Sequence, residues 1–194
     1  GCIQIGQGTL VTDWANDTAS VPVCFNYGKV TITAAPPADA VVFKVGTVNG
    51  QINETVCVDI SVEKFSKIVG ANVTFSWNFD QLEFIRTDNY NLEGLNASAF
   101  SNTNSTVKFL WTPQTTTSIT RADGTKIFQI CFRIKQCLPS IAVNITGTPD
   151  IVGEGNVQRA SQGVGGSVTC IVSQVCSATC TLGTITNVSC NGGT

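Results

Sequence analysis

The sequence predicts an all-β sandwich, and three observations support that prediction. Thr, Val, Ile, Asn, Ser and Gly are abundant; β-branched side chains favour a pleated strand, and Gly and Asn favour tight turns. Short apolar runs alternate with turn residues, and no stretch shows convincing helical periodicity. Only 12% of the 194 residues are charged and 42% are hydrophobic, which is enough apolar material for an ordinary core.

The chain divides into three predicted segments. Residues 1–40 contain a β-hairpin, 20–25 and 29–33, and end in a connector with consecutive prolines, which marks a domain boundary. Residues 41–173 form the main domain. Residues 174–194 are rich in cysteine and poor in large apolar residues, so we expect a linker or the start of a further module.

The main domain contains many short strand-like runs separated by turn residues. The predicted strands are 41–45, 55–60, 72–77, 82–86, 107–111, 126–134, 141–146 and 167–172. Asn49 and Gly50 are a strong hairpin-turn signal between the first two strands. Residues 62–69 are predicted to be a loop or a short helical turn. So many short strands favour a sandwich or jelly roll.

The nine cysteines predict disulfide bonds rather than a zinc site. Zinc ligands cluster in short Cys pairs, often with histidine, but only Cys176 and Cys180 have that spacing and the chain has no histidine. Disulfides persist in oxidising compartments, so we expect a secreted, extracellular or cell-surface protein. Because nine is odd, one cysteine is free or pairs outside this chain.

Candidate glycosylation sites fit the same compartment. Sequons of the form Asn-x-Ser/Thr occur at Asn16, Asn53, Asn72, Asn96, Asn104, Asn144 and Asn187. Thr18 lies in an Asp-Thr-Ala run that resembles an O-glycosylation signal of Bacteroidota, although a polar loop also explains this run.

The order of motifs in the main domain resembles that of cohesin domains. The matching runs are VGTVNG (45–50), VCVDISV (56–62), FSWNFDQLEF (75–84), VKFLW (107–111), ADGT (122–125) and IFQICFRI (127–134). The resemblance covers about residues 41–173 and implies a nine-stranded jelly-roll sandwich without a catalytic site.

The resemblance is greatest to a variant from large surface proteins of Bacteroidota, in which two core strands each carry a cysteine. It implies a disulfide between Cys57 and Cys131. Strand alternation agrees, because Val56 and Val58 flank Cys57, and Phe128 and Phe132 belong to the inward set around Cys131. Both cysteines are therefore expected on the outer face of one sheet.

The last ten residues, 185–194, are similar to the opening of repeats in giant gliding and adhesion proteins of the same bacteria. The chain also contains no Met. Together these features suggest a mature product or an internal piece of a modular array.

The sequence contains few residues that could form a catalytic or metal-binding site. The absence of histidine excludes Ser-His and Cys-His nucleophiles. Asp80 and Glu83 are the nearest carboxylate pair for a glycosidase, but they are interpreted as part of a turn, as are Asp123 and Gly124. The run 88–94 contains many oxygen donors but lacks the EF-hand pattern. We therefore expect no cofactor, with Ca²⁺ bound in this loop as the one alternative.

The three tryptophans raise the alternative of a sugar-binding platform. Trp77 and Trp111 lie in strands with alternating apolar neighbours and are predicted to be core or sheet-face residues. Trp14 lies in a polar loop and is the one expected to be exposed.

The resulting functional prediction is a structural or adhesive unit of an extracellular surface protein or filament, not an enzyme. Its partners would be copies of itself or neighbouring modules, with Cys2, Ile3, Gln4 and Ile5 pairing by strand exchange. The alternative is a recognition module, which binds a dockerin or a carbohydrate. A net charge of −2 gives no reason to expect nucleic acid, and no apolar run is long enough to span a membrane.

Overall fold

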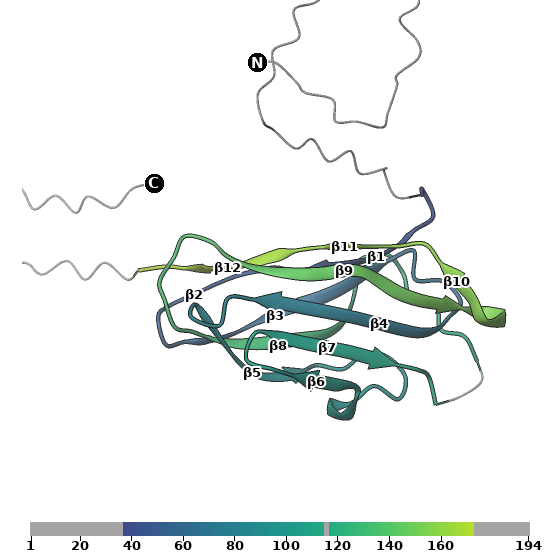
Figure 1. The fold of residues 1–194 in the computed structure, drawn as a ribbon, viewed down its shortest axis with the longest axis horizontal. Coiled ribbons are helices and arrows are strands. Elements are labelled where there is room, and N and C mark those ends of the chain that lie inside the picture. The colour runs from purple at the N-terminus through teal and green to yellow at the C-terminus, as the bar shows by residue number, and fades with distance from the viewer. Residues whose placement is uncertain (1–36, 115–116, 173–194) are drawn as a thin grey trace, which may run out of the picture. The chain divides into compact units, whose positions relative to one another are not determined.

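The computed structural model describes residues 37–114 and 117–172, which form two β-sheets packed face to face (Figure 1). One sheet has the strand order β11-β1-β3-β8-β5, and the other has β2-β12-β9-β4-β7-β6 with β10 paired to β9. The predicted all-β sandwich is confirmed. The strands are β1 Val41–Val45, β2 Thr47–Gly50, β3 Thr55–Glu63, β4 Ile68–Trp77, β5 Leu82–Asp88, β6 Phe100–Asn102, β7 Thr106–Trp111, β8 Thr125–Ile134, β9 Ile141–Gly153, β10 Val157–Arg159, β11 Ser161–Val164 and β12 Gly166–Cys170.

Two strands switch from one sheet to the other. β1 pairs antiparallel with β3, and after Gly46 the chain continues as β2 in the second sheet, parallel to β12. In the same way β11 runs parallel to β1 and leads through Gly165 into β12. The crossing requires glycine at Gly166, because a Cβ there would lie 2.1 Å from the Gly46 carbonyl oxygen. If β1 with β2 and β11 with β12 are each counted as one strand, and the short β10 is left out, the sandwich has the nine predicted strands.

Two local predictions are wrong, and both errors come from long-range strand pairing. Asn49 and Gly50 lie within β2 rather than in a turn, because β2 pairs with a strand far along the chain. The turn comes later, where Asn53 adopts a φ of 66°. Residues 62–69 are also not one loop, since β3 continues to Glu63 and β4 already begins at Ile68.

The core lies between the sheets and is entirely apolar among the described residues. In β3 and β4 nearly every second side chain is buried, which matches the two-residue period of a strand. Phe109 and Phe128 pack with ring centroids 4.9 Å apart at the centre. Trp77 and Trp111 are only 6% and 2% exposed, so their predicted core placement is confirmed.

Helical structure is confined, within the described residues, to two short 3₁₀ turns, Ala97–Ala99 and Glu154–Asn156. No helix in this part of the chain has the length and apolar character needed to cross a membrane.

Candidate functional site

Because the core takes the inward residues, any binding function must come from the outward ones. The two sheets differ sharply in these residues. We call the outer face of β1, β3, β8 and β5 the charged face, and the outer face of β9, β4, β7 and β6 the hydroxyl face. The charged face carries Lys44, Asp59, Glu63, Glu83, Arg86, Asp88, Lys126, Gln129 and Arg133. The hydroxyl face carries Asn72, Thr74, Ser76, Ser101, Thr106, Lys108, Leu110, Asn144, Thr146 and one carboxylate, Asp150, which lies opposite Asn72 and accepts a hydrogen bond from Gln158.

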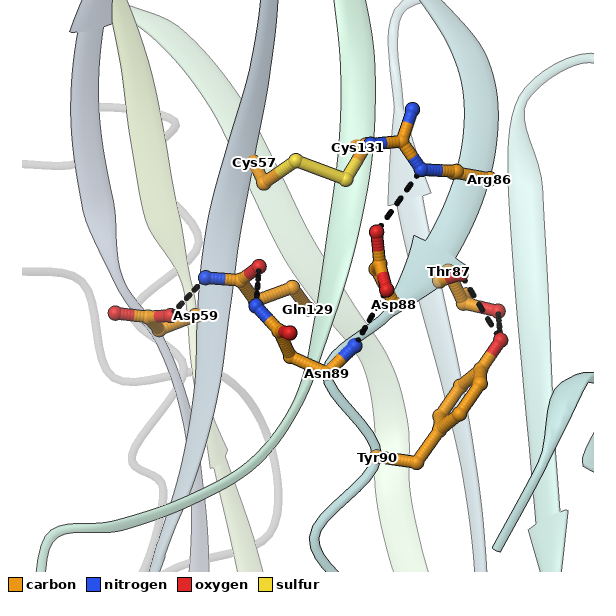
Figure 2. Close-up of a disulfide and its surroundings, with 9 residues drawn as sticks. All are labelled: Cys57, Asp59, Arg86, Thr87, Asp88, Asn89, Tyr90, Gln129 and Cys131. Carbon is orange, nitrogen blue, oxygen red and sulfur yellow. Dashed lines mark hydrogen bonds and ion pairs between the residues drawn. A yellow bond between two sulfur atoms is a disulfide. The ribbon is translucent and has the colours of Figure 1, made fainter.

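The charges of the charged face pair with one another. The ion pairs are Lys44–Glu63 at 2.5 Å, Lys126–Asp59 at 2.5 Å, Arg86–Asp88 at 3.0 Å, and Arg133–Glu83. Amides extend this network: the Gln129 side chain donates to Asp59 at 2.7 Å, and the Asn89 side chain donates to Gln129 at 2.6 Å (Figure 2). The charged side chains of this face are therefore paired within the domain.

The pairing lowers the pKa of two carboxyl groups. For Asp59, partial burial is the largest single influence and acts to raise the pKa. The hydrogen bonds from Lys126 and Gln129, with the charge of Lys126, outweigh burial and hold the pKa of Asp59 below its ordinary value. The pKa of Asp88 is lowered mainly by the hydrogen bond from the Asn89 backbone N–H and next by the hydrogen bond from Arg86.

The charged face also contains the disulfide between Cys57 and Cys131, the pair that the sequence predicted (Figure 2). The two cysteines lie directly opposite each other on β3 and β8, and their sulfur atoms are 2.05 Å apart. A second disulfide joins Cys137 to Cys170, a pairing that the sequence left open. The Cys170 N–H donates to the Leu138 carbonyl at 2.9 Å, which holds the end of β12 beside the loop after β8. The other five cysteines lie outside the described residues.

The hydroxyl face is built from directly paired residues on three long strands. Thr74 on β4 lies opposite Lys108 on β7 and opposite Thr146 on β9. Asn72 lies opposite Leu110, whose side chain is 59% exposed. Direct pairing places side chains on the same side of the sheet, so these residues form one continuous surface.

Most polar groups on the hydroxyl face have no partner within the domain. The Thr146 hydroxyl donates to Ser76 at 2.8 Å. Among the described residues, Lys108 makes no ion pair, and the side chains of Asn72 and Asn144 make no hydrogen bond. These groups are hydrated in the isolated domain and can hydrogen-bond to a partner. Sequence reasoning missed this face, because Ser, Thr and Asn also predict loops and only the strand register brings them together.

Comparison with known proteins identifies the fold family. The model of the cohesin domain matches residues 41–170. The chain belongs to the cohesin family. Cohesin domains are non-catalytic binding modules, typically found in extracellular or cell-surface scaffold proteins. No curated protein sequence matches the chain.

Solved cohesins have the same fold at low sequence identity. The sixth cohesin of scaffoldin B from Acetivibrio cellulolyticus, in complex with a mutant Cel5 dockerin, is 20% identical with a TM-score of 0.60, and the match covers 68% of this chain and 99% of that one. The OlpA cohesin in complex with Doc918 from Clostridium thermocellum is 17% identical with a TM-score of 0.58, covering 68% and 99%. A non-cellulosomal cohesin from Archaeoglobus fulgidus is 16% identical with a TM-score of 0.56, covering 69% and 92%.

The carboxylates considered for catalysis or metal binding have structural roles in this cohesin. Glu83 pairs with Arg133, and the Asp80 N–H donates to the side chain of Asn78 in a turn. Asp123 accepts the Lys64 backbone N–H, and Gly124 with a φ of 79° completes the predicted turn. Within residues 37–114 and 117–172, no group of three His, Cys, Asp or Glu residues is arranged to hold a metal ion.

A shallow groove of about 260 Å³ lies between the β4–β5 turn and the β6–β7 turn. It is lined by Phe79, Glu83, Phe84, Asn102, Thr103 and Asn104. Phe79 is the exposed aromatic ring on which a sugar would stack, but Lys135 Nζ lies 3.9 Å from the centre of this ring. This cation–π contact occupies one ring face, so the groove fits a carbohydrate poorly.

The candidate glycosylation sites fall into two groups. Asn53, Asn96 and Asn104 lie in exposed turns or loops. Asn72 and Asn144 lie in the middle of β4 and β9, on the hydroxyl face. The remaining candidates, Asn16, Thr18 and Asn187, lie outside the described residues, as do Trp14 and the strand-exchange residues Cys2, Ile3, Gln4 and Ile5.

Proposed function

We propose that this cohesin domain binds a dockerin-type protein module through its hydroxyl face. The observation that carries the proposal is the contrast between the two faces. The hydroxyl face combines the exposed Leu110 with the unpaired polar groups of Asn72, Lys108 and Asn144, whereas the charged face pairs its own charged side chains.

The chemistry of the hydroxyl face suits a protein partner. Protein interfaces commonly surround an apolar anchor with hydrogen-bonding groups that are hydrated before binding. Leu110 is such an anchor, next to the last residue of β7, with Asn72 directly opposite on β4. The outer face of a sheet cannot enclose a small molecule, but it can lie against the surface of another protein. Dockerins are also the partners named in the solved complexes of similar cohesins.

We further propose an extracellular location. Two disulfides in the described residues favour an oxidising compartment. A structural role within a longer surface protein remains a second candidate, supported by terminal strands that leave the domain at opposite ends (Figure 1). The predicted strand exchange, the filament role and the domain boundaries at 40 and 173 stay predictions.

The binding proposal is tested with dockerin modules encoded by the same organism, using calorimetry on the full chain. We expect Leu110→Asp to weaken binding of the recognised dockerin at least about tenfold, because it buries a charge in the interface. The matched control is Ile85→Asp, since Ile85 is also apolar and 39% exposed but belongs to β5 of the other sheet. Equal losses for both variants, or binding unchanged by Leu110→Asp, would refute the assignment.

A further inference from the structure

The two disulfides divide the domain into consecutive closed loops. Cys57–Cys131 closes a loop with a sequence separation of 74, and Cys137–Cys170 closes one with a separation of 33. The second loop begins after the first has ended, so the loops neither overlap nor enclose one another. The shortest covalent route from Pro37 to Cys170 therefore uses only residues 37–57, the first disulfide, residues 131–137 and the second disulfide.

The chain ends of the domain are placed for tension along its long axis. β1 begins where Val41 faces Ser161, and β2 ends where Gly50 faces Cys170. Both pairings are parallel, so the chain enters at one end of the sandwich and leaves at the other (Figure 1). A pull on the two chain ends thus acts along these strands, with the Cys137–Cys170 bond at the exit.

We infer that the disulfides give this domain a tension-carrying function: they form a covalent bypass that carries a pulling force through the module and limits its extension. Once β1 and β2 are pulled away, force reaches Cys57, crosses to Cys131, follows the end of β8 to Cys137 and leaves at Cys170. The strands inside the two closed loops are not part of this route.

The bypass leaves the hydroxyl face off the path of the force. β4, β6 and β7 lie in the first closed loop, and β9 lies in the second. Tension therefore does not act directly on the residues that contact a partner; this consequence rests on the proposed function. The bypass itself depends only on the disulfides and the chain topology.

The test is single-molecule stretching of the full chain under oxidising conditions, held by its two ends. Relative to wild type, we expect Cys137→Ser/Cys170→Ser to release about 110 Å more chain on unfolding, because an extended residue spans roughly 3.3–3.6 Å. For the same reason Cys57→Ser/Cys131→Ser should release about 250 Å more. Residues 1–36 and 173–194 are identical in all three proteins, so their contribution cancels.

A second measurement covers the case in which Cys57→Ser/Cys131→Ser does not fold. Wild-type protein is unfolded under force and then exposed to a dithiol reductant, and the same two increments should appear as separate steps. Lengths that do not change in the variants, or the absence of these two increments when the unfolded wild type is reduced, would overturn the bypass. These lengths are measured without a partner, so a failure to bind dockerin would leave them unaffected.

Discussion

The two outer faces of this sandwich have the same strand geometry but differ in the pairing of their polar side chains. On the charged face, Asp59 is held by Lys126 and Gln129, and Glu83 by Arg133. On the hydroxyl face, Lys108 and Asn72 have no partner among the described residues. A partner docking on the charged face would have to desolvate pairs that already satisfy each other, whereas on the hydroxyl face it replaces water.

The comparison shows that the core and the outer faces are built from alternate residues of the same strands. In β4, inward Val73 and Phe75 build the core, while outward Asn72, Thr74 and Ser76 build the hydroxyl face. Substitutions at outward positions should therefore change binding or surface pairing without disturbing the fold.

The largest effect is expected from the disulfide of the charged face. Replacing both Cys57 and Cys131 by Ala should lower the free energy of unfolding by about 2–5 kcal/mol, because the bond closes a long loop in the unfolded chain. Urea denaturation of the oxidised protein measures this loss. At a temperature where the variant stays folded, binding through the hydroxyl face should persist. An unchanged unfolding midpoint would contradict the prediction.

A smaller effect is expected when the hydroxyl face is made to resemble the charged face. Thr74→Asp places a carboxylate directly opposite Lys108, so Lys108 gains an ion partner. Stability should change by no more than about 1 kcal/mol, as for exposed ion pairs. Dockerin affinity should fall about tenfold, since the pair must be desolvated on binding. Calorimetry and urea denaturation separate the two effects.

The matched control for Thr74→Asp lies on the charged face. Ser61 lies opposite Lys126 in the register of β3 and β8, so Ser61→Asp likewise adds a carboxylate opposite a lysine, although Lys126 already pairs with Asp59. It should leave dockerin affinity unchanged. If it weakened binding as much as Thr74→Asp, the distinction between the two faces would be wrong.

The sequence predicted what depends on local alternation and missed what depends on long-range register. Val56, Val58 and Ile60 alternate with Cys57, which was enough to place Cys57 on an outer face. The sheet switch of β2 could not be predicted in this way, because its partner β12 is distant in the chain. The Cys137–Cys170 pair depends on the same arrangement, which brings the end of β12 to the loop after β8.

A further difference between the faces should appear in acid. The pKa of Asp59 in the folded protein lies below its ordinary value of 3.8. The carboxylate therefore stabilises the fold above that pH, and the contribution is lost as pH falls through the lowered pKa. Asp59→Asn should be less stable than wild type by up to about 1 kcal/mol at neutral pH. The difference in free energy of unfolding between wild type and Asp59→Asn should disappear as the pH falls below about 4. Urea midpoints across pH 2–7 check this, and a difference independent of pH would contradict it.

The smallest effects compare two lysines that differ in their partners. Lys126 is 69% exposed and pairs with Asp59, whereas Lys108 has no ion pair among the described residues. Lys126→Ala should cost between 0 and about 1 kcal/mol at low salt, and less at about 1 M salt, where exposed pairs are screened. Lys108→Ala should leave stability unchanged at either salt concentration but weaken dockerin binding. Lys126 lies on the opposite side of the sandwich from the hydroxyl face, so it cannot contact a partner bound there. If Lys126→Ala weakened dockerin binding and Lys108→Ala did not, the partner would dock on the charged face.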